Sequence, residues 1–343
     1  MTLRTKFAAV AVSLISVAPF GVTAAPAPAV VGTATEIPGV VKGGSPIQRI
    51  VTGYRGLDDP IGLKDGSLLF SEPDARRLHQ LNTRTDEASV FIAESNESHG
   101  VTEDAQGRLI SAQAWDGSTR IGVIYPKGSE AVLADKYNGM AFSRPNDLIV
   151  ARNGGIYFTD PGLTKQQAEE LVKRNGGKAL GPRLSPAVYY IAPGQAPVKI
   201  EDKLIRPNGV QLNRDETKLY VDDSNGEHVI VWDIRPDGLV ANRREFATLK
   251  GRSNRDNGLG GVKTFADGMT VDNDDRLYVA TGGGVEVFSP QGQPLGIIPV
   301  RCPPADCQNI AFSGPAKQTL YIGGAGSLYK VEMTSRGLTT RSK

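Results

Sequence analysis

A strand–turn–strand pattern recurs along this chain, and the repetition limits the fold more than any other feature of the sequence. Each copy begins with a small polar residue, continues as an alternating strand, turns at Gly or Asp, and ends in a second apolar strand. The most regular copy, NDLIVARNGGIYFTDP, occupies residues 146–161. Internal repeats of about 20 to 50 residues indicate solenoids, propellers or other arrays, because each unit must bury its apolar face on its neighbours.

Six copies of the pattern occur. They begin near Pro60, His99, Asn146, Asn208, Asp267 and Gln308. A second pair of short strands follows within the intervals, as at residues 77–81, 187–191, 228–232 and 284–288. With 40 glycines available for turns, the pattern predicts an all-β protein, a six-bladed β-propeller with four-stranded antiparallel blades.

One segment departs from the strand pattern. Residues 165–174 have helical periodicity and predict a short helix within an insertion, residues 162–186, after the third copy. The insertion is expected on the face of the channel mouth, where it is either a lid that sets specificity or a surface loop without a role. The basic loop at residues 249–264 is expected to border the same mouth.

The N-terminus has the features of a secretory signal peptide. Two basic residues precede an apolar stretch, residues 7–22, and the sequence VTA at residues 22–24 resembles a signal-peptidase site. We predict cleavage after Ala24, and a periplasmic or secreted protein without a membrane segment once the signal is removed. The alternative is an uncleaved membrane anchor, for which the apolar stretch is short.

The rest of the chain forms one domain in this interpretation. An extended Pro- and Ala-rich linker is expected at residues 25–48, the propeller at residues 49–335 and a C-terminal tail at residues 336–343. With 39 basic and 37 acidic residues, the chain has no charge excess that would favour nucleic acid as a partner.

Cys302 and Cys307 are the two cysteines of the chain. In the oxidising compartment expected for an exported protein, they predict a local disulfide that closes a small loop. A zinc site is not favoured, because two thiols without a nearby histidine cannot complete a tetrahedral shell. The disulfide is expected to fix the loop and suggests no redox chemistry.

The polar residues that begin the copies are candidates for the chemistry. In a propeller the first strand of every blade lines the central channel, so these residues converge on one mouth of it. They are His99, Asn146, Asn208, Asp267 and Gln308, with Asp58 or Asp59 in the first copy. Each could instead make an Asx turn that satisfies backbone groups. Their shared repeat position favours a ring of oxygen ligands for a hard divalent cation such as Ca²⁺ or Mg²⁺.

Three motifs give the chain a resemblance to a known family. They are RPND at residues 144–147, RPNG at residues 206–209 and ADGM at residues 266–269, each followed by a strand–turn–strand. With these motifs the chain resembles the gluconolactonase family, which includes senescence-marker protein (regucalcin) and luciferin-regenerating enzyme. The resemblance covers about residues 50–335. It implies a six-bladed propeller with one divalent cation near the channel mouth, and hydrolysis of lactones or esters.

The resemblance also implies a set of metal ligands. Asn146, Asn208 and Asp267 match the positions of family ligands. The remaining family ligand is a glutamate in a Glu-x-Pro context. Asp58 of the DDP sequence occupies its place with a shorter side chain, and the register of the repeats leaves Asp59 as a competitor. Calcium is the expected cation, with Mg²⁺, Mn²⁺ and Zn²⁺ as alternatives.

Three further residues are assigned to substrate binding. Arg144 resembles an arginine with which some family members contact substrate, and Asp147 follows the ligand asparagine as in the family, where that acid faces the substrate. His99 stands where gluconolactonases often have asparagine, which puts the sugar lactone itself in question as the substrate.

The implied activity is that of an exported, metal-dependent lactone hydrolase acting on a small-molecule lactone or ester. The cation would polarise the lactone carbonyl and lower the pKa of the attacking water. Asp267 would be the catalytic base that accepts the proton of this water. The alternatives are a phosphotriesterase-type or other ester hydrolase on the same metal site, and a non-catalytic propeller that binds a partner.

Overall fold

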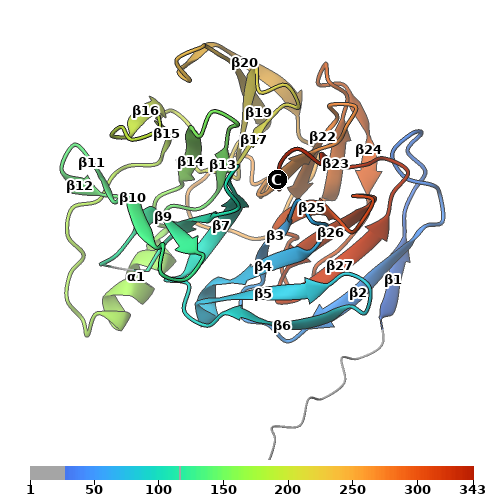
Figure 1. Cartoon of the computed structure of the whole chain (residues 1–343), viewed down its shortest axis with the longest axis horizontal. Coiled ribbons are helices and arrows are strands. Elements are labelled where there is room, and N and C mark those ends of the chain that lie inside the picture. The colour runs from blue at the N-terminus through green and yellow to red at the C-terminus, as the bar shows by residue number, and fades with distance from the viewer. Residues whose placement is uncertain (1–27, 116) are drawn as a thin grey trace, which may run out of the picture.

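Six β-sheets of four or five antiparallel strands surround a central axis in the computed structural model of the chain (Figure 1). The structure describes residues 28–115 and 117–343. The predicted signal peptide, residues 1–24, lies outside the described residues. The sheets confirm the prediction of an all-β, six-bladed propeller.

Each of the first five blades takes four consecutive strands, and the first of them lies innermost. Blade 1 contains β3 (Asp58–Gly62), β4 (Leu68–Glu72), β5 (Arg77–Asn82) and β6 (Glu87–Ile92). Blade 2 contains β7 (Ser98–Glu103), β8 (Leu109–Gln113), β9 (Arg120–Tyr125) and β10 (Ala131–Ala134). Blade 3 contains β13 (Leu148–Val150), β14 (Ile156–Asp160), β15 (Ala187–Ile191) and β16 (Val198–Glu201). The short hairpin of β11 (Lys136–Tyr137) and β12 (Met140–Ala141) connects blades 2 and 3.

The second half of the ring follows the same order. Blade 4 contains β17 (Pro207–Leu212), β18 (Lys218–Asp223), β19 (His228–Ile234) and β20 (Val240–Thr248). Blade 5 contains β21 (Met269–Val271), β22 (Leu277–Thr281), β23 (Gly284–Phe288) and β24 (Pro294–Ile298). Blade 6 contains β25 (Asn309–Ser313), β26 (Thr319–Gly324) and β27 (Ser327–Glu332).

The N-terminal strands complete blade 6 and close the ring. β2 (Pro46–Thr52) pairs antiparallel with β27, and β1 (Ala29–Thr33) pairs with β2. The prediction of an extended linker at residues 25–48 is therefore wrong for the part that forms these strands. The physical reason is the open edge of β27, because the last repeat supplies only three strands and its unpaired backbone groups need a partner.

Aromatic side chains fill the space between the blades. The second strands of four blades carry a tyrosine at the same position, each at most 1% exposed. These residues are Tyr157, Tyr220, Tyr278 and Tyr321. Burial of a large apolar side chain contributes about 1.5–3 kcal/mol, and a buried hydroxyl needs a partner, as when Tyr157 donates to the Gly238 carbonyl at 2.7 Å. Blades buried on both faces explain the continuous apolar runs of these strands.

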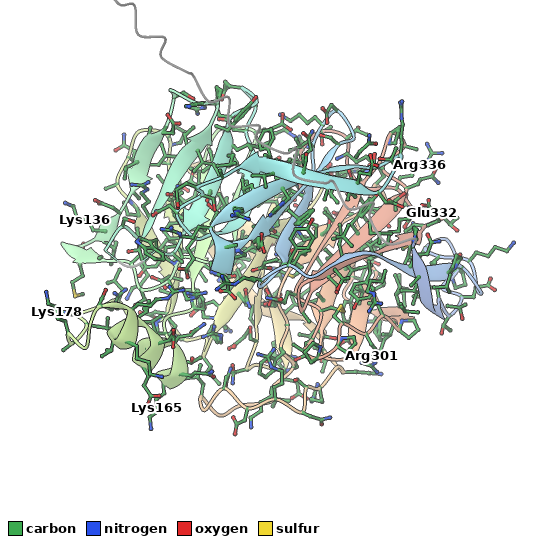
Figure 2. The ribbon with its side chains drawn as sticks, turned by 90° about the horizontal axis from the view of Figure 1, so that it is seen from below. Lys136, Lys165, Lys178, Arg301, Glu332 and Arg336 are labelled. Carbon is green, nitrogen blue, oxygen red and sulfur yellow. A yellow bond between two sulfur atoms is a disulfide. The ribbon has the colours of Figure 1, made fainter. Side chains whose placement is uncertain are left out.

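The insertion after β14 contains the predicted helix. α1 (Lys165–Arg174) begins with a capping box, in which the Thr164 hydroxyl accepts from the backbone of Gln167 and the Gln167 side chain accepts from the backbone of Thr164. Figure 2, which marks Lys165 and Arg301, shows the insertion and the Arg301 segment on the same side of the disc. Among the described residues, no helix has the length and apolar character needed to cross a membrane.

Residues 336–343 do not form a free tail, so that part of the prediction is corrected. The C-terminus lies at the centre of the ring (Figure 1). There the Lys343 side chain is fully buried, and its ammonium group contacts the carboxylates of Asp59 and Asp147. Arg341 donates to the Leu212 carbonyl. The segment enters the channel because two buried acids inside it require a positive partner.

Candidate active site at the channel mouth

The strand-entry residues of all six blades line one cavity of about 490 Å³. They are Asp58, His99, Asn146, Asn208, Asp267 and Gln308. Arg144 and Arg206 line it from the loops before β13 and β17, while Gln167 of the insertion and Arg255 of the 249–264 loop lie at its rim. The fold thus brings together residues that are far apart in the sequence, as the repeats predicted.

A β-bulge at the start of the inner strands aims these side chains. β3 shifts register between Asp58 and Ile61, β7 between Ser98 and Val101, and β17 between Pro207 and Val210. A bulge places an extra, unpaired residue in one strand and redirects its side chains. His99 and Asn208 lie inside the shifted segments, and Asp58 is the last paired residue before one of them; all three line the cavity.

Glycines beside the entry residues let neighbouring inner strands approach each other closely. A Cβ atom at Gly100 would lie 2.7 Å from the Asn146 carbonyl oxygen. One at Gly209 would lie 2.0 Å from the Asp267 carbonyl oxygen. Real Cβ atoms do not approach backbone oxygens this closely, so any side chain at these positions would push the ring of entry residues apart.

We expect Gly209→Ala to lower the free energy of unfolding by about 3 kcal/mol, because the methyl group collides with the backbone of the next blade. Chemical denaturation measures this loss. The matched control is Gly181→Ala, where an added Cβ meets no atom within 4 Å, so stability should stay the same or rise by less than about 1 kcal/mol. Equal stability of the two variants would contradict the close approach.

The residues present fit a divalent cation. The Asn208 amide nitrogen donates to the Ser224 hydroxyl at 3.0 Å, and this contact turns the amide oxygen Oδ1 the other way. Oδ1 is buried, and no donor in the described part of the chain forms a hydrogen bond with it. A buried hydrogen-bond acceptor without a donor is unfavourable unless a bound ligand interacts with it. The donor set of two amides and two carboxylates, from Asn146, Asn208, Asp58 and Asp267, is of the type that hard cations take.

The electrostatics of the cavity also favour the binding of a cation. Burial raises the pKa of Asp267 well above its usual value, and repulsion from Asp58, Asp222 and Asp147 raises it further. Among the described residues, no group of three His, Cys, Asp or Glu side chains has the arrangement of a metal site. The candidate set is consistent with that finding because half of its members are asparagines. A cation among them would relieve the repulsion between the carboxylates.

The structure distinguishes the two acids of the first blade. Asp58 lines the cavity, and its carboxylate contacts His99 Nδ1 at 3.2 Å. Although burial raises the pKa of Asp58, the hydrogen bond with His99 outweighs this effect together with the other contacts and leaves it lowered. Asp59 turns into the channel instead, where it accepts from the Val101 amide and from Lys343. Asp58 is therefore the acid of this pair that can reach a guest in the cavity.

Asp147 does not face the cavity, which corrects its assignment to substrate binding. Its carboxylate accepts from the Val210 amide at 2.9 Å and the Leu148 amide at 2.8 Å, and it contacts the Lys343 ammonium group. The residue is 1% exposed. The side chain following the entry residue points down the channel because strand residues alternate in direction.

Arg144 and His99 lie in a charged network on one wall of the cavity. Arg144 Nη1 donates to Glu97 Oε1 at 2.9 Å, and Arg144 Nη2 lies 2.7 Å from His99 Nε2. Arg174 at the end of α1 donates to the other Glu97 oxygen at 2.9 Å. Glu97 and Arg174 are functional candidates that the sequence did not predict. Neither belongs to the repeated motif, and only the fold brings them to Arg144.

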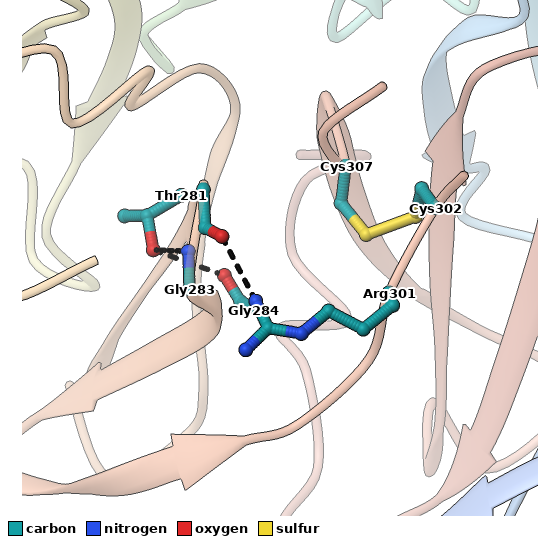
Figure 3. The surroundings of a disulfide bond; sticks show 7 residues. Thr281, Gly283, Gly284, Arg301, Cys302 and Cys307 are labelled. Carbon is teal, nitrogen blue, oxygen red and sulfur yellow. Dashed lines mark hydrogen bonds between the residues drawn. A yellow bond between two sulfur atoms is a disulfide. The ribbon is translucent and has the colours of Figure 1, made fainter. Parts of the chain in front are cut away.

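The predicted disulfide between Cys302 and Cys307 is present (Figure 3). Cys307 lines the cavity. Asp306, inside the loop that the disulfide closes, accepts from the Ser253 hydroxyl at 2.7 Å. Next to the disulfide, Arg301 donates to the Gly282 carbonyl at 2.9 Å. The disulfide therefore fixes the loop that holds the 249–264 segment at the rim.

Comparison with known proteins agrees with this geometry. The sequence matches the family described as the SMP-30/Gluconolactonase/LRE-like region over residues 61–326. It is 29% identical to a gluconolactonase of Zymomonas mobilis over 312 residues, which cover 85% of this chain and 83% of the relative.

Solved structures show the same architecture. A gluconolactonase of Xanthomonas campestris superimposes with a TM-score of 0.73 at 27% identity, covering 91% of this chain and 99% of that one. A regucalcin of Agrobacterium tumefaciens, described as a calcium-binding protein, has a TM-score of 0.65 at 15% identity, covering 84% of this chain and 93% of that one. At that identity the regucalcin shows the shared fold alone. The family match over residues 61–326 establishes that the chain belongs to the SMP-30/gluconolactonase/LRE-like family.

Proposed function

We propose that this protein is a lactone hydrolase of the gluconolactonase type that works with one divalent cation. The candidate ligands are Asp58, Asn146, Asn208 and Asp267. The observation that carries the proposal is their convergence in one cavity, where Asn208 presents a buried oxygen without a donor. The name of the Zymomonas mobilis relative, gluconolactonase, supports the substrate class. The all-oxygen donor set suits a hard cation, for which we propose calcium, with Mg²⁺ as the alternative of the same ligand type.

The chain's own residues provide the remaining chemistry. A divalent cation, when bound, would polarise a lactone carbonyl and favour ionisation of water. Asp267, whose carboxylate has no hydrogen bond from any described residue, is free to accept the proton of the attacking water. Arg144, held in place by Glu97, is positioned to orient the substrate. Water adds to the carbonyl carbon, the ring C–O bond breaks, and the product is a hydroxy acid.

We expect the purified protein to hydrolyse at least one lactone in a panel of sugar, aliphatic and aryl lactones, and only with a divalent cation present. A pH-stat records the acid released. Chelation should abolish the activity, and added Ca²⁺, Mg²⁺ or Mn²⁺ should restore it. The proposed ligands do not polarise the lactone carbonyl by themselves, so hydrolysis should require the positive charge of the cation.

Two outcomes would contradict the proposal. Full activity after chelation would exclude the metal mechanism. Inactivity towards every lactone, with cation bound, would exclude the substrate class, and an aryl phosphotriester in the same panel then tests the phosphotriesterase alternative. The matched negative control is the protein incubated with chelator and then with Na⁺ in place of the divalent cation.

We also propose that the protein is exported, as its N-terminal sequence predicts. The disulfide supports this proposal, because disulfides persist mainly in oxidising compartments. Fractionation of cells that produce the full chain, with sequencing of the mature N-terminus, tests it. Recovery of the uncleaved chain in the cytoplasm would contradict it.

A further inference from the structure

Two arginines occupy equivalent places in blades 3 and 4. Each belongs to an Arg-Pro-Asn sequence that leads into an inner strand, at residues 144–146 and 206–208. In blade 3 the Asp160 carboxylate accepts from the Arg144 amide at 2.9 Å. In blade 4 the Asp223 carboxylate accepts from the Arg206 amide at the same distance, 2.9 Å. The backbone is therefore fixed in the same way, and both side chains line the cavity.

The two guanidinium groups differ in their partners. Arg144 is neutralised by Glu97, with 2.9 Å between Nη1 and Oε1. Among the described residues, no acceptor forms a hydrogen bond or ion pair with the Arg206 side chain, and its Nη1 is buried without a partner. Three acids have charges that favour Arg206. Asp267 is a candidate cation ligand, and Asp223 and Asp160 accept from backbone amides.

An unpaired guanidinium at the edge of a buried cavity is unfavourable by itself. A guanidinium group carries its charge at neutral pH, so Arg206 keeps a positive charge whose hydrogen-bond donors have no acceptor among the described residues. Glu170 and Asp74 also line the cavity but are exposed at its rim, where water screens their charges. The donors of the Arg206 guanidinium are therefore satisfied only when a bound ligand supplies a hydrogen-bond acceptor.

The balance of charges in the cavity indicates which charge the bound ligand should carry. The carboxylates of Asp58 and Asp267 match the two charges of a divalent cation. Glu97 neutralises Arg144, while Arg174, which shares Glu97, is exposed and does not line the cavity, so water screens its charge. The charge of Arg206 is left over. A guest with a single negative charge would complete the balance, and a planar carboxylate suits the paired donors of a guanidinium.

We propose that Arg206 binds a carboxylate on the substrate, so that the preferred substrates of this site are lactones whose ring carries a carboxylate group. This inference rests on the proposed lactonase function and names the substrate class within it. Arg206 is then the residue that determines specificity, while the chemistry at the ring carbonyl stays with Asp267 and the cation ligands.

A matched pair of substrates tests the inference. The first is 5-oxotetrahydrofuran-2-carboxylate, and the second is the neutral 5-(hydroxymethyl)dihydrofuran-2-one, which has the same ring. We expect the protein with cation to prefer the carboxylate in kcat/KM by about tenfold or more. Arg206→Gln should lower kcat/KM for the carboxylate by about 10- to 100-fold, as for loss of a charged hydrogen bond, and leave the neutral lactone nearly unchanged.

The control variant is Arg255→Gln. Arg255 lies at the rim of the same cavity, but it is exposed and 3.7 Å from its partner Asp306. It should change the ratio of the two kcat/KM values by less than about twofold. Arg206→Gln should not lower the thermal stability of the protein, because the variant removes a buried charge without a partner. A large loss of stability in Arg206→Gln would show a structural role and overturn the inference.

Binding gives a readout that is independent of turnover. Calorimetry with 2-hydroxyglutarate, the product from the charged lactone, should show binding to the cation-loaded protein and loss of at least about tenfold in affinity in Arg206→Gln. If the protein hydrolyses the neutral lactone but does not prefer the charged one, the inference is wrong and the proposed function stands. If neither lactone nor any other is hydrolysed, the proposed function fails instead.

Discussion

Replacing Asp267 with asparagine is expected to lower kcat/KM for lactone hydrolysis by about 1000-fold, within the range for loss of a general base. The substitution keeps the size of the side chain and an oxygen that can face a cation. It removes the negative charge and the basic oxygen. Asp267 is the natural position for this role because its carboxylate opens to the cavity and receives no hydrogen bond from the described residues.

The experiment separates two roles of Asp267 by varying the cation concentration. Loss of a ligand alone weakens cation binding, so saturating Ca²⁺ would restore most of the activity. Loss of the base leaves activity low when calorimetry shows the cation site to be full. We expect the second result, and recovery to more than about one tenth of the original rate at saturation would contradict the assignment of the base.

Asp272→Asn is the matched control for this experiment. Asp272 is a buried acid in the same blade, but it lies in the hairpin turn after β21 and accepts from Arg276 and the Tyr278 hydroxyl. Its role is structural, so the control should lower stability without a specific loss of kcat. Equal loss of kcat in both variants would show that any buried acid of blade 5 matters in the same way.

Replacing Lys343 with methionine is expected to lower the free energy of unfolding by about 3–5 kcal/mol, as for removal of one partner of a buried ion pair. The ammonium group lies 2.9 Å from Asp59 and also contacts Asp147, and the side chains are almost completely buried. Methionine keeps the length of the side chain but leaves two carboxylates facing each other in the channel. Denaturation by urea measures the loss.

The size of the effect depends on burial, and a second lysine tests that dependence. Lys199 pairs with Asp202 at 2.7 Å, but both side chains are exposed. Lys199→Met should therefore lower stability by no more than about 1 kcal/mol. Combining Lys343→Met with Asp59→Asn and Asp147→Asn should recover part of the loss, because the uncompensated charges are gone. A stable single variant at position 343 would contradict the buried contact.

Most of the fold could be predicted from the sequence because a propeller is periodic. The copy at residues 146–161 contains a turn and two strands that form locally, and β13 and β14 follow it closely. The helix of the insertion was also predictable, since Thr164 and Gln167 make a local cap. The strands β1 and β2 were not, because β2 pairs with β27 almost 300 residues later, β1 pairs only with β2 among the described strands, and neither carries a repeat of its own.

The candidate site was likewise predictable only in part from the sequence. The positions of Asp58, Asn146, Asn208 and Asp267 follow from the repeat, because equivalent strand starts meet at one end of the ring. The direction of a side chain was harder to predict. Asp58 and Asp59 are adjacent and chemically alike, and only the bulge in β3 decides that Asp58 faces the cavity.

By itself, the sequence determined the number of blades, the ring of polar residues at the channel mouth, and the cysteine pair that forms the disulfide. These features depend on residues close together in the chain or on a repeated spacing. The tertiary structure alone decided that Asp147 pairs with Lys343 inside the channel and that Glu97 neutralises Arg144. It also decided that the Arg206 side chain has no hydrogen-bond partner among the described residues. Contacts between residues distant in the sequence determine whether each buried charge is neutralised, because the energy of a buried charge depends on the groups that the fold places beside it.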